Sequence, residues 1–385
     1  MNEYIGIAVK FWSVGMNVLH IVSNISLRNG IMSVLMNYYR YVDRKEANFC
    51  FLFFDERPET YGKEIEELGG VLYKFTRKNF MSEWRHFCKE HYGEFDVLHN
   101  HELYLAHFFK KSKKKLGNKI LISHAHATRF SDSKIKELRN KILALPSKNA
   151  DYLLACSKDA GKSLFNKNFE QNGYILKNAI DISRYMFNES AREQIRNKYN
   201  ISNKFVVGHV GNFTPPKNHF FLLQVFNEII KLKSNSILLL VGDGYLREEI
   251  KKEASNYGFE DKVIFVGVTN SVTDYLCAMD IYVFPSLFEG LGIALVEAQT
   301  NGLPCVYSDV IPQEADILNE NNIRLSLDVS PKEWADEILA IERERYLVKN
   351  EIEEAGYDIS KEALKLIQFY RDGLEGIESV SLRRG

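Results

Sequence analysis

Short apolar runs alternate along the chain with longer stretches in which apolar residues recur every three or four positions. The short runs are typical of buried strands, and the longer stretches are typical of amphipathic helices. Strands that alternate with helices in this way predict an α/β fold with parallel sheets. Thirteen strands are predicted, at 18–22, 49–54, 71–74, 97–100, 120–123, 152–155 and 174–176 in the first half and at 205–210, 237–241, 263–266, 281–284, 304–307 and 323–325 in the second.

The two sets of strands are separated by residues 182–203, which are polar and helix-prone and carry no strand signal. Because 385 residues are too many for one ordinary core, we expect two domains, at 1–181 and 204–357, joined by a linker at 182–203. Two interpretations of residues 1–15 stay open. They are an upstream extension, since Met16 stands directly before the first strand, or they are native.

Composition excludes several classes of protein. With 45% hydrophobic and 26% charged residues the chain is globular, and a net charge of −1 gives no reason to expect nucleic acid as a partner. The five cysteines form no Cys-x-x-Cys pair, which argues against a disulfide framework or a zinc site and favours a reducing compartment. No apolar run reaches the length of a membrane span, and the first fifteen residues lack the pattern of a signal peptide. We therefore expect a cytoplasmic protein.

Residues 286–298 carry the most distinctive chemistry. Glu289 and Glu297 are eight positions apart, directly after a predicted strand. We expect a helix to begin near Gly290, where free backbone N–H groups and the helix dipole attract phosphate. Glu297 would then lie about two turns along that helix. A phosphate site between two carboxylates suits a nucleotide sugar. The open backbone between the carboxylates consists of Gly290, Leu291 and Gly292.

This segment resembles the Glu-x7-Glu signature of retaining nucleotide-sugar glycosyltransferases with the GT-B fold, in particular their large fourth family. The likeness extends in order from about residue 16 to residue 370, and it is strongest to bacterial enzymes that assemble capsular polysaccharides and exopolysaccharides. The other segments that carry it are 18–23, Asn29-Gly30, 36–40, Ser123-His-Ala-His126, 177–181, 208–218, Val241-Gly-Asp-Gly244, 302–305 and 355–359.

The resemblance implies two Rossmann-like domains whose parallel sheets face each other across a cleft, with a last helix in 358–385 that crosses back onto the first domain. It also implies transfer of a sugar from a nucleotide diphosphate, expected to be UDP, to a growing lipid-linked glycan with retention of anomeric configuration. Ligands of open α/β sheets bind beyond the carboxyl ends of the strands, and the matching loops occupy such places.

Roles for individual residues follow from the same resemblance. Lys217 would hold the donor's diphosphate, Glu289 would lie nearest the reacting sugar, and Glu297 would bind the ribose. His126 would contact a hydroxyl of the donor sugar. Each of these residues also has a structural interpretation as a solvated side chain of a loop or a helix face. The donor-binding backbone would include the loops at Gly30, Gly242 and Gly244.

The chain departs from the family pattern at Asn212. The family usually has Arg or Lys five positions before the diphosphate-binding lysine, and an Asn side chain cannot replace a planar cation. We therefore hypothesise that Arg28 or another cation substitutes for it. The family also prefers two glycines where this chain has Asn29-Gly30, and we expect Asn29 to keep the turn through a left-handed backbone.

No metal or other cofactor is expected, because cationic groups and helix N-termini can neutralise the phosphates. Alternation along the strand is expected to turn only one of His124 and His126 into the cleft. A metal bound by this pair lacks an indicated third ligand. His99 and His101 carry a weaker version of the same hypothesis.

One local cluster of charge suggests a partner. Five lysines stand beside Phe108 and Phe109 on a predicted helix, and such a cluster suits docking to an anionic membrane surface, where each lysine contributes about 1 kcal/mol. The alternative is a solvated basic face. The protein would then act peripherally at the inner face of the membrane. The lysines are Lys110, Lys111, Lys113, Lys114 and Lys115.

Two other functions remain open. The same fold and cleft suit a nucleotide-sugar epimerase or a sugar phosphorylase. Because Asn212 weakens the expected contacts with phosphate, the chain is alternatively a catalytically degenerate partner subunit that binds sugar.

Overall fold

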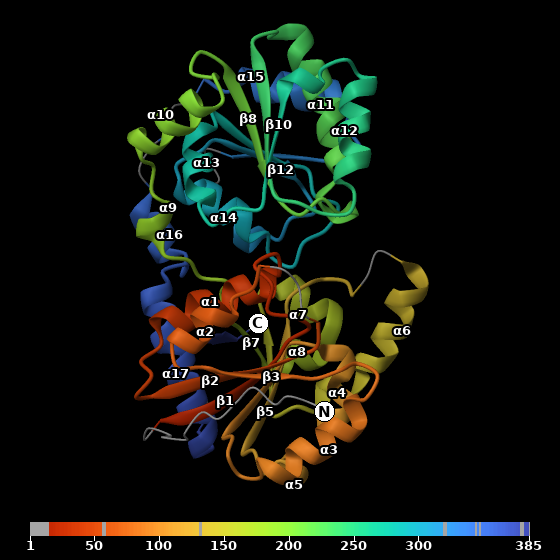
Figure 1. Ribbon diagram of the computed structural model, residues 1–385, viewed down its shortest axis with the longest axis vertical. Coiled ribbons are helices and arrows are strands. Elements are labelled where there is room, and N and C mark those ends of the chain that lie inside the picture. Colours follow the sequence, from red (N-terminus) through yellow and green to blue (C-terminus); the bar gives the residue numbers. More distant parts are fainter. Residues whose placement is uncertain are drawn as a thin grey trace.

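The computed structural model describes residues 15–55, 59–130, 133–318, 322–342, 345, 348–377 and 381–384. Residues 1–15, for which two interpretations were left open, therefore lie outside the described residues, except for Gly15. Two sheets, each with its own helices, lie one above the other in Figure 1. The predicted α/β architecture with parallel sheets is confirmed.

The first sheet has the strand order β14-β7-β6-β5-β4-β1-β2-β3. All its pairings are parallel except that of β14 with β7. The seven strands predicted in the first half are all present, whereas β14 was not predicted. The bounds are β1 (Met16–Ile21), β2 (Ala47–Phe53), β3 (Val71–Lys74), β4 (Val97–Asn100), β5 (Ile120–Ala125), β6 (Tyr152–Ala155), β7 (Gly173–Ile175) and β14 (Arg383–Arg384).

Both faces of this sheet are buried, which explains the continuous apolar runs. Alternate residues of β1 face opposite ways: Val18 packs into the cluster with helices α1 and α17, and Leu19 packs into the cluster with α3. Helix α17 comes from the end of the chain and lies against α1 (Figure 1). The helices of this half are α1 (Gly30–Tyr41), α2 (Gly62–Glu67), α3 (Phe80–Glu90), α4 (Ala106–Phe109), α5 (Ser112–Lys115), α6 (Lys134–Ala144), α7 (Lys158–Phe165), α8 (Lys167–Asn172) and, from the C-terminal part, α17 (Ile359–Glu375).

The second sheet is entirely parallel, with the order β10-β9-β8-β11-β12-β13. All six strands predicted in this half are present. They are β8 (Phe205–Val210), β9 (Ser236–Val241), β10 (Val263–Gly267), β11 (Ile281–Phe284), β12 (Cys305–Ser308) and β13 (Asn322–Leu325). The helices are α11 (His219–Leu232), α12 (Arg247–Asn256), α13 (Val272–Ala278), α14 (Ile293–Thr300), α15 (Pro331–Ala340) and α16 (Lys349–Glu354).

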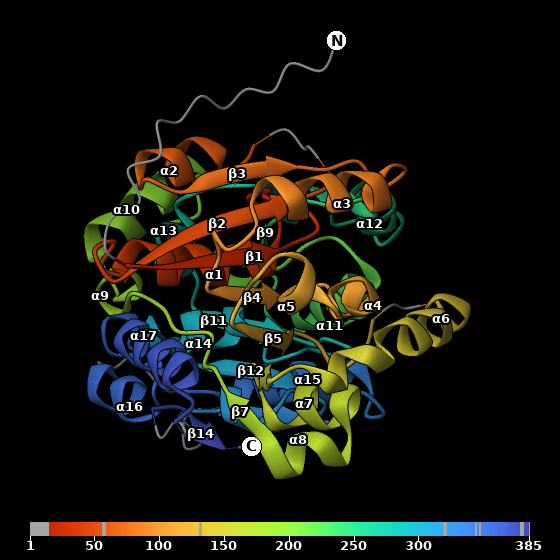
Figure 2. The same cartoon turned by 90° about the horizontal axis from the view of Figure 1, so that it is seen from below.

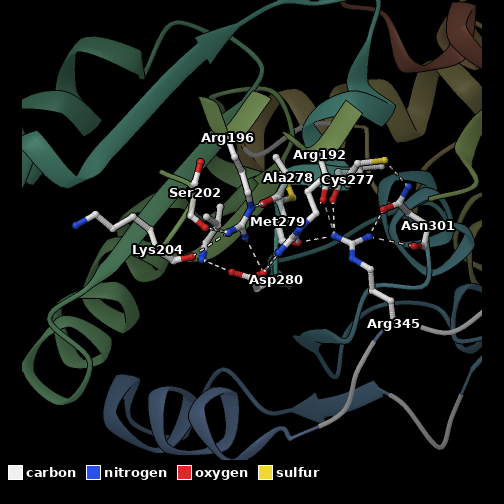
Figure 3. Close-up of polar contacts among 12 residues, drawn as sticks. Arg192, Arg196, Ser202, Lys204, Cys277, Ala278, Met279, Asp280, Asn301 and Arg345 are labelled. Carbon is white, nitrogen blue, oxygen red and sulfur yellow. Dashed lines mark hydrogen bonds and ion pairs between the residues drawn. The ribbon is translucent and has the colours of Figure 1, made fainter. Parts of the chain in front are cut away.

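The segment expected to be a linker is attached to the second sheet. It contains α9 (Ile182–Tyr185) and α10 (Glu189–Lys198). Two arginines of α10 donate to one carboxylate oxygen of Asp280, Arg192 at 2.5 Å and Arg196 at 2.7 Å (Figure 3). Burial alone would raise the pKa of Asp280, but these hydrogen bonds outweigh it and hold the pKa below its usual value. Helix α10 is therefore fixed to the second domain.

Arg345 binds the same part of the second domain. Its guanidinium donates to the backbone carbonyls of Leu276 at 2.8 Å and Cys277 at 3.1 Å, and to Asn301 (Figure 3). Burial lowers the pKa of Arg345 to about 10, because carbonyl oxygens compensate a buried charge less well than a carboxylate does.

Two expectations from composition concern the whole chain. All five cysteines are buried and carry free thiols. Among the described residues, none of the helices has the length and apolar character needed to cross a bilayer.

Candidate active site

A pocket of about 810 Å³ lies between the two domains. All of the predicted site residues except Gly244 line it. From the first domain these are Gly30 and His126, and from the second they are Asn212, Lys217, Gly242, Glu289, Gly290, Leu291, Gly292 and Glu297. The structure therefore brings together residues that are up to 267 positions apart in the chain, from Gly30 to Glu297.

The order of the strands explains where the pocket lies. β8 is central and pairs with β9 on one side and β11 on the other. The chain runs outward from β8 to β10 and then returns to start again at β11, so the strand order reverses between β8 and β11. A ligand crevice opens beyond the carboxyl ends of strands at such a switch point. Lys217 follows β8 and Glu289 follows β11, so they border it.

Lys217 and Glu289 form an ion pair inside this crevice. The lysine Nζ lies 2.6 Å from Oε1 of Glu289, and the Ser286 hydroxyl donates to the same oxygen at 2.8 Å. The ammonium also lies 4.8 Å from the centre of the Phe284 ring. The two charged side chains are only 19% and 14% exposed, so each is held in place while one edge faces the pocket. An incoming phosphate would compete for the ammonium, and sugar hydroxyls would compete for the carboxylate.

The helix after β11 begins later than the sequence indicated. Helix α14 starts at Ile293 and is preceded by Gly292, whose φ of 91° lies in the left-handed region that favours glycine. The predicted start at Gly290 was therefore wrong, because the left-handed residue interrupts the helical backbone. The free N–H groups at the beginning of α14 still adjoin the pocket, since Gly292, Ile293 and Ala294 line it.

Gly290 lines the pocket and also has a packing role that was not predicted. A Cβ atom at this position would lie 1.9 Å from the carbonyl oxygen of His126, so only glycine lets the two domains approach this closely. Two hydrogen bonds from the first domain cross the junction here. Ser157 Oγ donates to the Gly290 carbonyl at 2.5 Å, and Thr128 Oγ1 donates to the Glu289 carbonyl at 3.3 Å. The loop that holds Glu289 is therefore positioned by both domains.

Glu297 lies on the second turn of α14 and is 8% exposed. The hydroxyl of Tyr185 donates to its Oε1 at 2.8 Å. Burial raises the pKa of Glu297 to about 7, against the lowering effects of that hydrogen bond and of Arg184 and Lys217. Tyr185 was not predicted as a site residue, because it belongs to α9 in the segment expected to be a linker.

A cation does stand beside Asn212. Asn212 Nδ2 donates to the backbone carbonyl of Arg28 at 3.2 Å, across the junction between the domains. The Arg28 guanidinium also lines the pocket, where it pairs with Asp243 at 3.0 Å and with Glu59 at 3.6 Å. Arg28 therefore lies in the pocket wall next to Asn212, with its guanidinium paired with two carboxylates.

The loop between β1 and α1 differs from the expectation. Asn29 has φ −88° and is not left-handed; its side chain instead caps α1 by accepting from the Ile31 N–H at 3.0 Å. Gly30 begins the helix, and the space where its Cβ would point is open. The N-terminus of a second helix, 12 residues long, therefore adjoins the pocket.

The two glycines after β9, Gly242 and Gly244, have different positions relative to the pocket. Gly242 lines the pocket, whereas Gly244 lies outside the pocket wall. A Cβ on Gly244 would lie 2.4 Å from the carbonyl oxygen of Phe213, so this glycine serves packing between two loops. Its predicted contact with the donor is not supported by its position.

Five histidines from three neighbouring strands form a connected group behind the pocket. His126 Nε2 lies 2.7 Å from His101 Nδ1, and His101 Nε2 lies 3.0 Å from His20 Nδ1. His99 joins His124 at 3.2 Å and the Tyr370 hydroxyl of α17 at 2.8 Å. His124 and His126 lie on the same side of the chain, so the expected separation by alternation was wrong. Depth separates them instead, because His124 is 1% exposed and only His126 lines the pocket.

These imidazoles are neutral. Burial lowers the pKa of His126 and of His20 to about 3, and burial together with the neighbouring rings lowers the pKa of His101 well below its usual value. The structure also supplies the third histidine that the sequence did not indicate: His101, His124 and His126 each offer a nitrogen within 4.8 Å of the others. The hydrogen bonds from His126 through His101 to His20 already use nitrogens of these rings, so we interpret the group as a hydrogen-bonded chain that orients His126.

The lysine cluster near residue 110 lacks the aromatic anchor that was expected. Phe109 is fully buried, and the Phe108 ring packs edge-on against Phe80 with centroids 4.7 Å apart. Lys113 pairs with Asp151 at 2.7 Å. The five lysines are exposed, whereas Phe109 is buried and Phe108 is only partly exposed.

The sequence of this chain is similar to those of known proteins. Residues 191–358 match the family model described as glycosyl transferases group 1. EpsF of Bacillus subtilis (strain 168), named as a glycosyltransferase, is 31% identical over 378 residues, covering 93% of this chain and 97% of EpsF. CapH of Staphylococcus aureus, named as a capsular polysaccharide biosynthesis glycosyltransferase, is 25% identical, covering 91% and 98%.

Two further matches add a named reaction and a fold. An Escherichia coli protein named UDP-Gal:alpha-D-GlcNAc-diphosphoundecaprenol alpha-1,3-galactosyltransferase is 25% identical over 254 residues, covering 63% of this chain and 64% of that protein. The crystal structure of Anabaena Alr3699/HepE in complex with UDP and glucose superposes with a TM-score of 0.74 at 17% identity, covering 94% of this chain and all of that one. The expected GT-B fold is confirmed.

Proposed function

Because this chain belongs to the group 1 glycosyl transferases, we propose that it moves a sugar from a UDP-linked donor to a lipid-linked glycan with retention of anomeric configuration. The observation that carries the proposal is the Lys217–Glu289 ion pair at the switch point of the second sheet, inside the pocket between the domains. A cation for the leaving phosphate and a carboxylate for the sugar are the two groups that this transfer needs at one place.

The diphosphate is proposed to bind between Lys217 and the start of α14. Breaking the bond from the anomeric carbon to the phosphate builds negative charge on the leaving oxygen, which the Lys217 ammonium and the free N–H groups of α14 would stabilise. Binding would break the ion pair of 2.6 Å and release Glu289 for the sugar. The pair keeps each side chain oriented until a donor arrives.

Arg28 is proposed to supply the cation that Asn212 lacks. The guanidinium comes from the first domain, so the two domains would share the charge of the diphosphate. The family pattern instead places both cations on the second domain. Donor binding would therefore draw the domains together in this chain.

On the sugar side, Glu289 would accept hydrogen bonds from the ring hydroxyls and offset positive charge on the sugar. His126 would contact another hydroxyl from the opposite wall, and Glu297 would accept from the ribose. The neutral state of His126 suits a contact with a hydroxyl, since one ring nitrogen remains able to donate or accept while Nε2 bonds His101.

The donor and the acceptor are supported by relatives. UDP occurs with HepE, and the Escherichia coli galactosyltransferase is named for a UDP donor and a diphosphoundecaprenol acceptor. The name of CapH connects a relative with capsular polysaccharide, and we place this chain in capsule or exopolysaccharide assembly at the cytoplasmic face of the membrane. We also propose that the transfer needs no metal ion, since Lys217 and Arg28 can neutralise the diphosphate.

A panel of nucleotide sugars tests the proposal. A donor at 100 times its dissociation constant stabilises the folded protein by about 2.7 kcal/mol, which a thermal shift resolves. The donor identified in this way is then assayed for release of UDP with and without a glycan acceptor. Release that depends on acceptor and is lost in Glu289→Ala supports a transferase, whereas release or isomerisation without acceptor favours an epimerase or a phosphorylase. A folded protein with no affinity for any nucleotide would identify a degenerate subunit.

A further inference from the structure

Helix α6 carries its apolar residues on the outside. Ile135 is 83% exposed, Leu138 63% and Ile142 59%, and Leu145, one turn beyond, is 55% exposed. At about 100° per residue the four side chains fall within about 80° of arc, so they form one stripe. A helix of a globular protein normally turns such a stripe toward the core. Here the stripe faces away from the protein, and we call it the α6 stripe.

The inner side of α6 explains this orientation. Glu137 accepts a hydrogen bond from the Phe130 N–H at 2.7 Å and is 15% exposed, and Ala144 is buried. The polar Glu137 therefore anchors the helix, and the leucine and isoleucine side chains are left outside. In Figures 1 and 2 α6 stands out from the side of the first domain. No other described segment covers the α6 stripe, since its residues keep more than half of their surface exposed.

Basic residues border the stripe. Lys134, Lys136, Arg139 and Lys141 are exposed, and Glu137 is the only acidic residue of the helix, which gives α6 four positive charges against one negative. By the same rotation per residue, Arg139 lies on one border of the stripe and Lys134 on the other. Helix α4 packs against α6, and five exposed lysines at 110–115 follow α4 in the chain.

We propose that α6 is an interfacial helix that inserts the α6 stripe into an anionic lipid surface. An apolar stripe with basic borders is the pattern by which a helix lies in the plane of a membrane, with its apolar side among the acyl chains and its lysines at anionic headgroups. Four side chains are too few for a stable protein interface, which takes about 20 to 30 residues a side. The lysines at 110–115 add attraction at longer range, and α6 supplies the anchor that Phe108 and Phe109 do not.

Helix α6 is connected to the pocket by a short stretch of chain. His126 and Ala127 line the pocket, and Arg129 packs against the Phe288 ring at 5.2 Å, next to Glu289 in the second domain. Helix α6 begins five residues after Arg129, at Lys134. A membrane bound by α6 would therefore lie within a short loop of the pocket. This step rests on the proposed function, because a lipid-linked acceptor gives the arrangement its use.

Binding to vesicles tests the inference. Wild type is sedimented with vesicles of equal parts phosphatidylglycerol and phosphatidylcholine, and we expect the triple variant Ile135→Ser/Leu138→Ser/Ile142→Ser to lower the partition coefficient at least tenfold. The matched control is Leu232→Ser/Leu364→Ser, which changes leucines of similar exposure, 62% and 66%, on α11 and α17 and should leave binding unchanged. Neutralising Lys134, Lys136 and Arg139 with Gln should weaken binding and reduce its dependence on salt.

A local probe identifies the face that inserts. The fluorescence emission of Leu138→Trp should shift to the blue when anionic vesicles are added. The control is Leu364→Trp, whose emission should not shift under the same conditions. Absent vesicle binding by wild type, equal binding by the triple variant, or an unshifted Trp at position 138 would overturn the inference. So would a dimer of the free protein that the triple variant abolishes, since the α6 stripe would then be a contact between copies.

An activity assay separates this inference from the proposed function. The triple variant should transfer sugar to a water-soluble acceptor as wild type does, and it should lose transfer to the same acceptor on a lipid in vesicles. If the triple variant lost vesicle binding but wild type had no transferase activity, the inference about α6 would stand and the proposed function would be wrong. Equal transfer by both proteins to the vesicle-bound acceptor would defeat the membrane role while the transferase stands.

Discussion

The two walls of the pocket meet a ligand in different ways. The wall from the second domain presents charge, with the Lys217–Glu289 pair and the buried Glu297. The wall from the first domain presents the neutral ring of His126, backed by His101, and one cation, Arg28, that pairs with Asp243 of the second domain. Under the proposed function, Lys217 and Arg28 would stabilise the charge of the diphosphate while His126 would orient the sugar, so catalysis would require both domains to close on one donor.

The largest effect is expected from the charged wall. Lys217→Ala should lower kcat/KM about a hundred- to a thousandfold, because it removes the ammonium that offsets charge on the leaving phosphate. Lys231→Ala on α11, whose side chain is 57% exposed, is the matched control and should leave the rate unchanged. The measurement is steady-state release of UDP at several donor concentrations. A loss of less than threefold in Lys217→Ala would remove the charge contrast between the walls.

The neutral wall should give a smaller loss that does not depend on pH. His126→Ala should lower kcat about ten- to a hundredfold by losing one hydrogen bond to the sugar, and His101→Ala should lower it less. Because burial lowers the pKa of His126 to about 3, the ratio of wild-type to His126→Ala rates should stay constant from pH 5 to 8. A ratio that changes with a midpoint near pH 6.5 would mean that this wall is charged in use.

A third prediction concerns the cation shared across the walls. Arg28→Ala should raise the KM for donor about tenfold, since a charge-assisted contact with the diphosphate is lost. Adding Asn212→Arg to this variant should restore most of the affinity by returning the cation to the second domain. If Arg28→Ala bound donor normally, or the double variant showed no recovery, the sharing of charge between domains would be wrong.

Glu297 should give the smallest effect, and one that does depend on pH. Burial raises its pKa to about 7, so the carboxylate that would accept from the ribose forms only as the pH passes that value. UDP affinity should differ little between wild type and Glu297→Gln at pH 6, and wild type should bind about fivefold tighter at pH 8. Both proteins share the titration of the diphosphate, so calorimetric comparison of the two isolates Glu297. A constant difference over this range would contradict the prediction.

The same carboxyl sets a dependence of stability on pH. Its pKa is raised from 4.5 to about 7, so the folded protein holds a proton that the unfolded chain has released between these values. Its stabilising contribution is full below pH 4.5 and is lost as the pH rises through 7. Urea unfolding should therefore show wild type losing stability relative to Glu297→Gln between pH 5 and 8.

Much of the fold could be predicted from the sequence, because each buried strand has a short, continuous run of apolar residues. All thirteen predicted strands are present, and the one that was missed, β14, consists of two arginines without an apolar pattern. The site on the second domain was also accessible, since Lys217 and Glu289 each follow a central strand. The late start of α14 was missed because the backbone of Gly292 is left-handed, and a Gly-x-Gly segment reads equally well as the first turn.

Other features depended on contacts between distant segments. The role of Gly290 follows from the His126 carbonyl of the other domain, and no local pattern indicates it. Histidines at alternate positions of two strands were visible, but their connection to His20 required the pairing of β1 with β4. Helical periodicity shows that α6 has an apolar stripe, but only the structure shows that the stripe faces outward.

The most direct test of the account is a crystal structure with UDP bound. We predict the diphosphate between the Lys217 ammonium and the first N–H groups of α14, with the ribose hydroxyls at Glu297 and the Arg28 guanidinium at a phosphate oxygen. Glu289 should have separated from Lys217. UDP bound outside this pocket, or bound with the Lys217–Glu289 pair intact and no phosphate contact, would contradict the central claim.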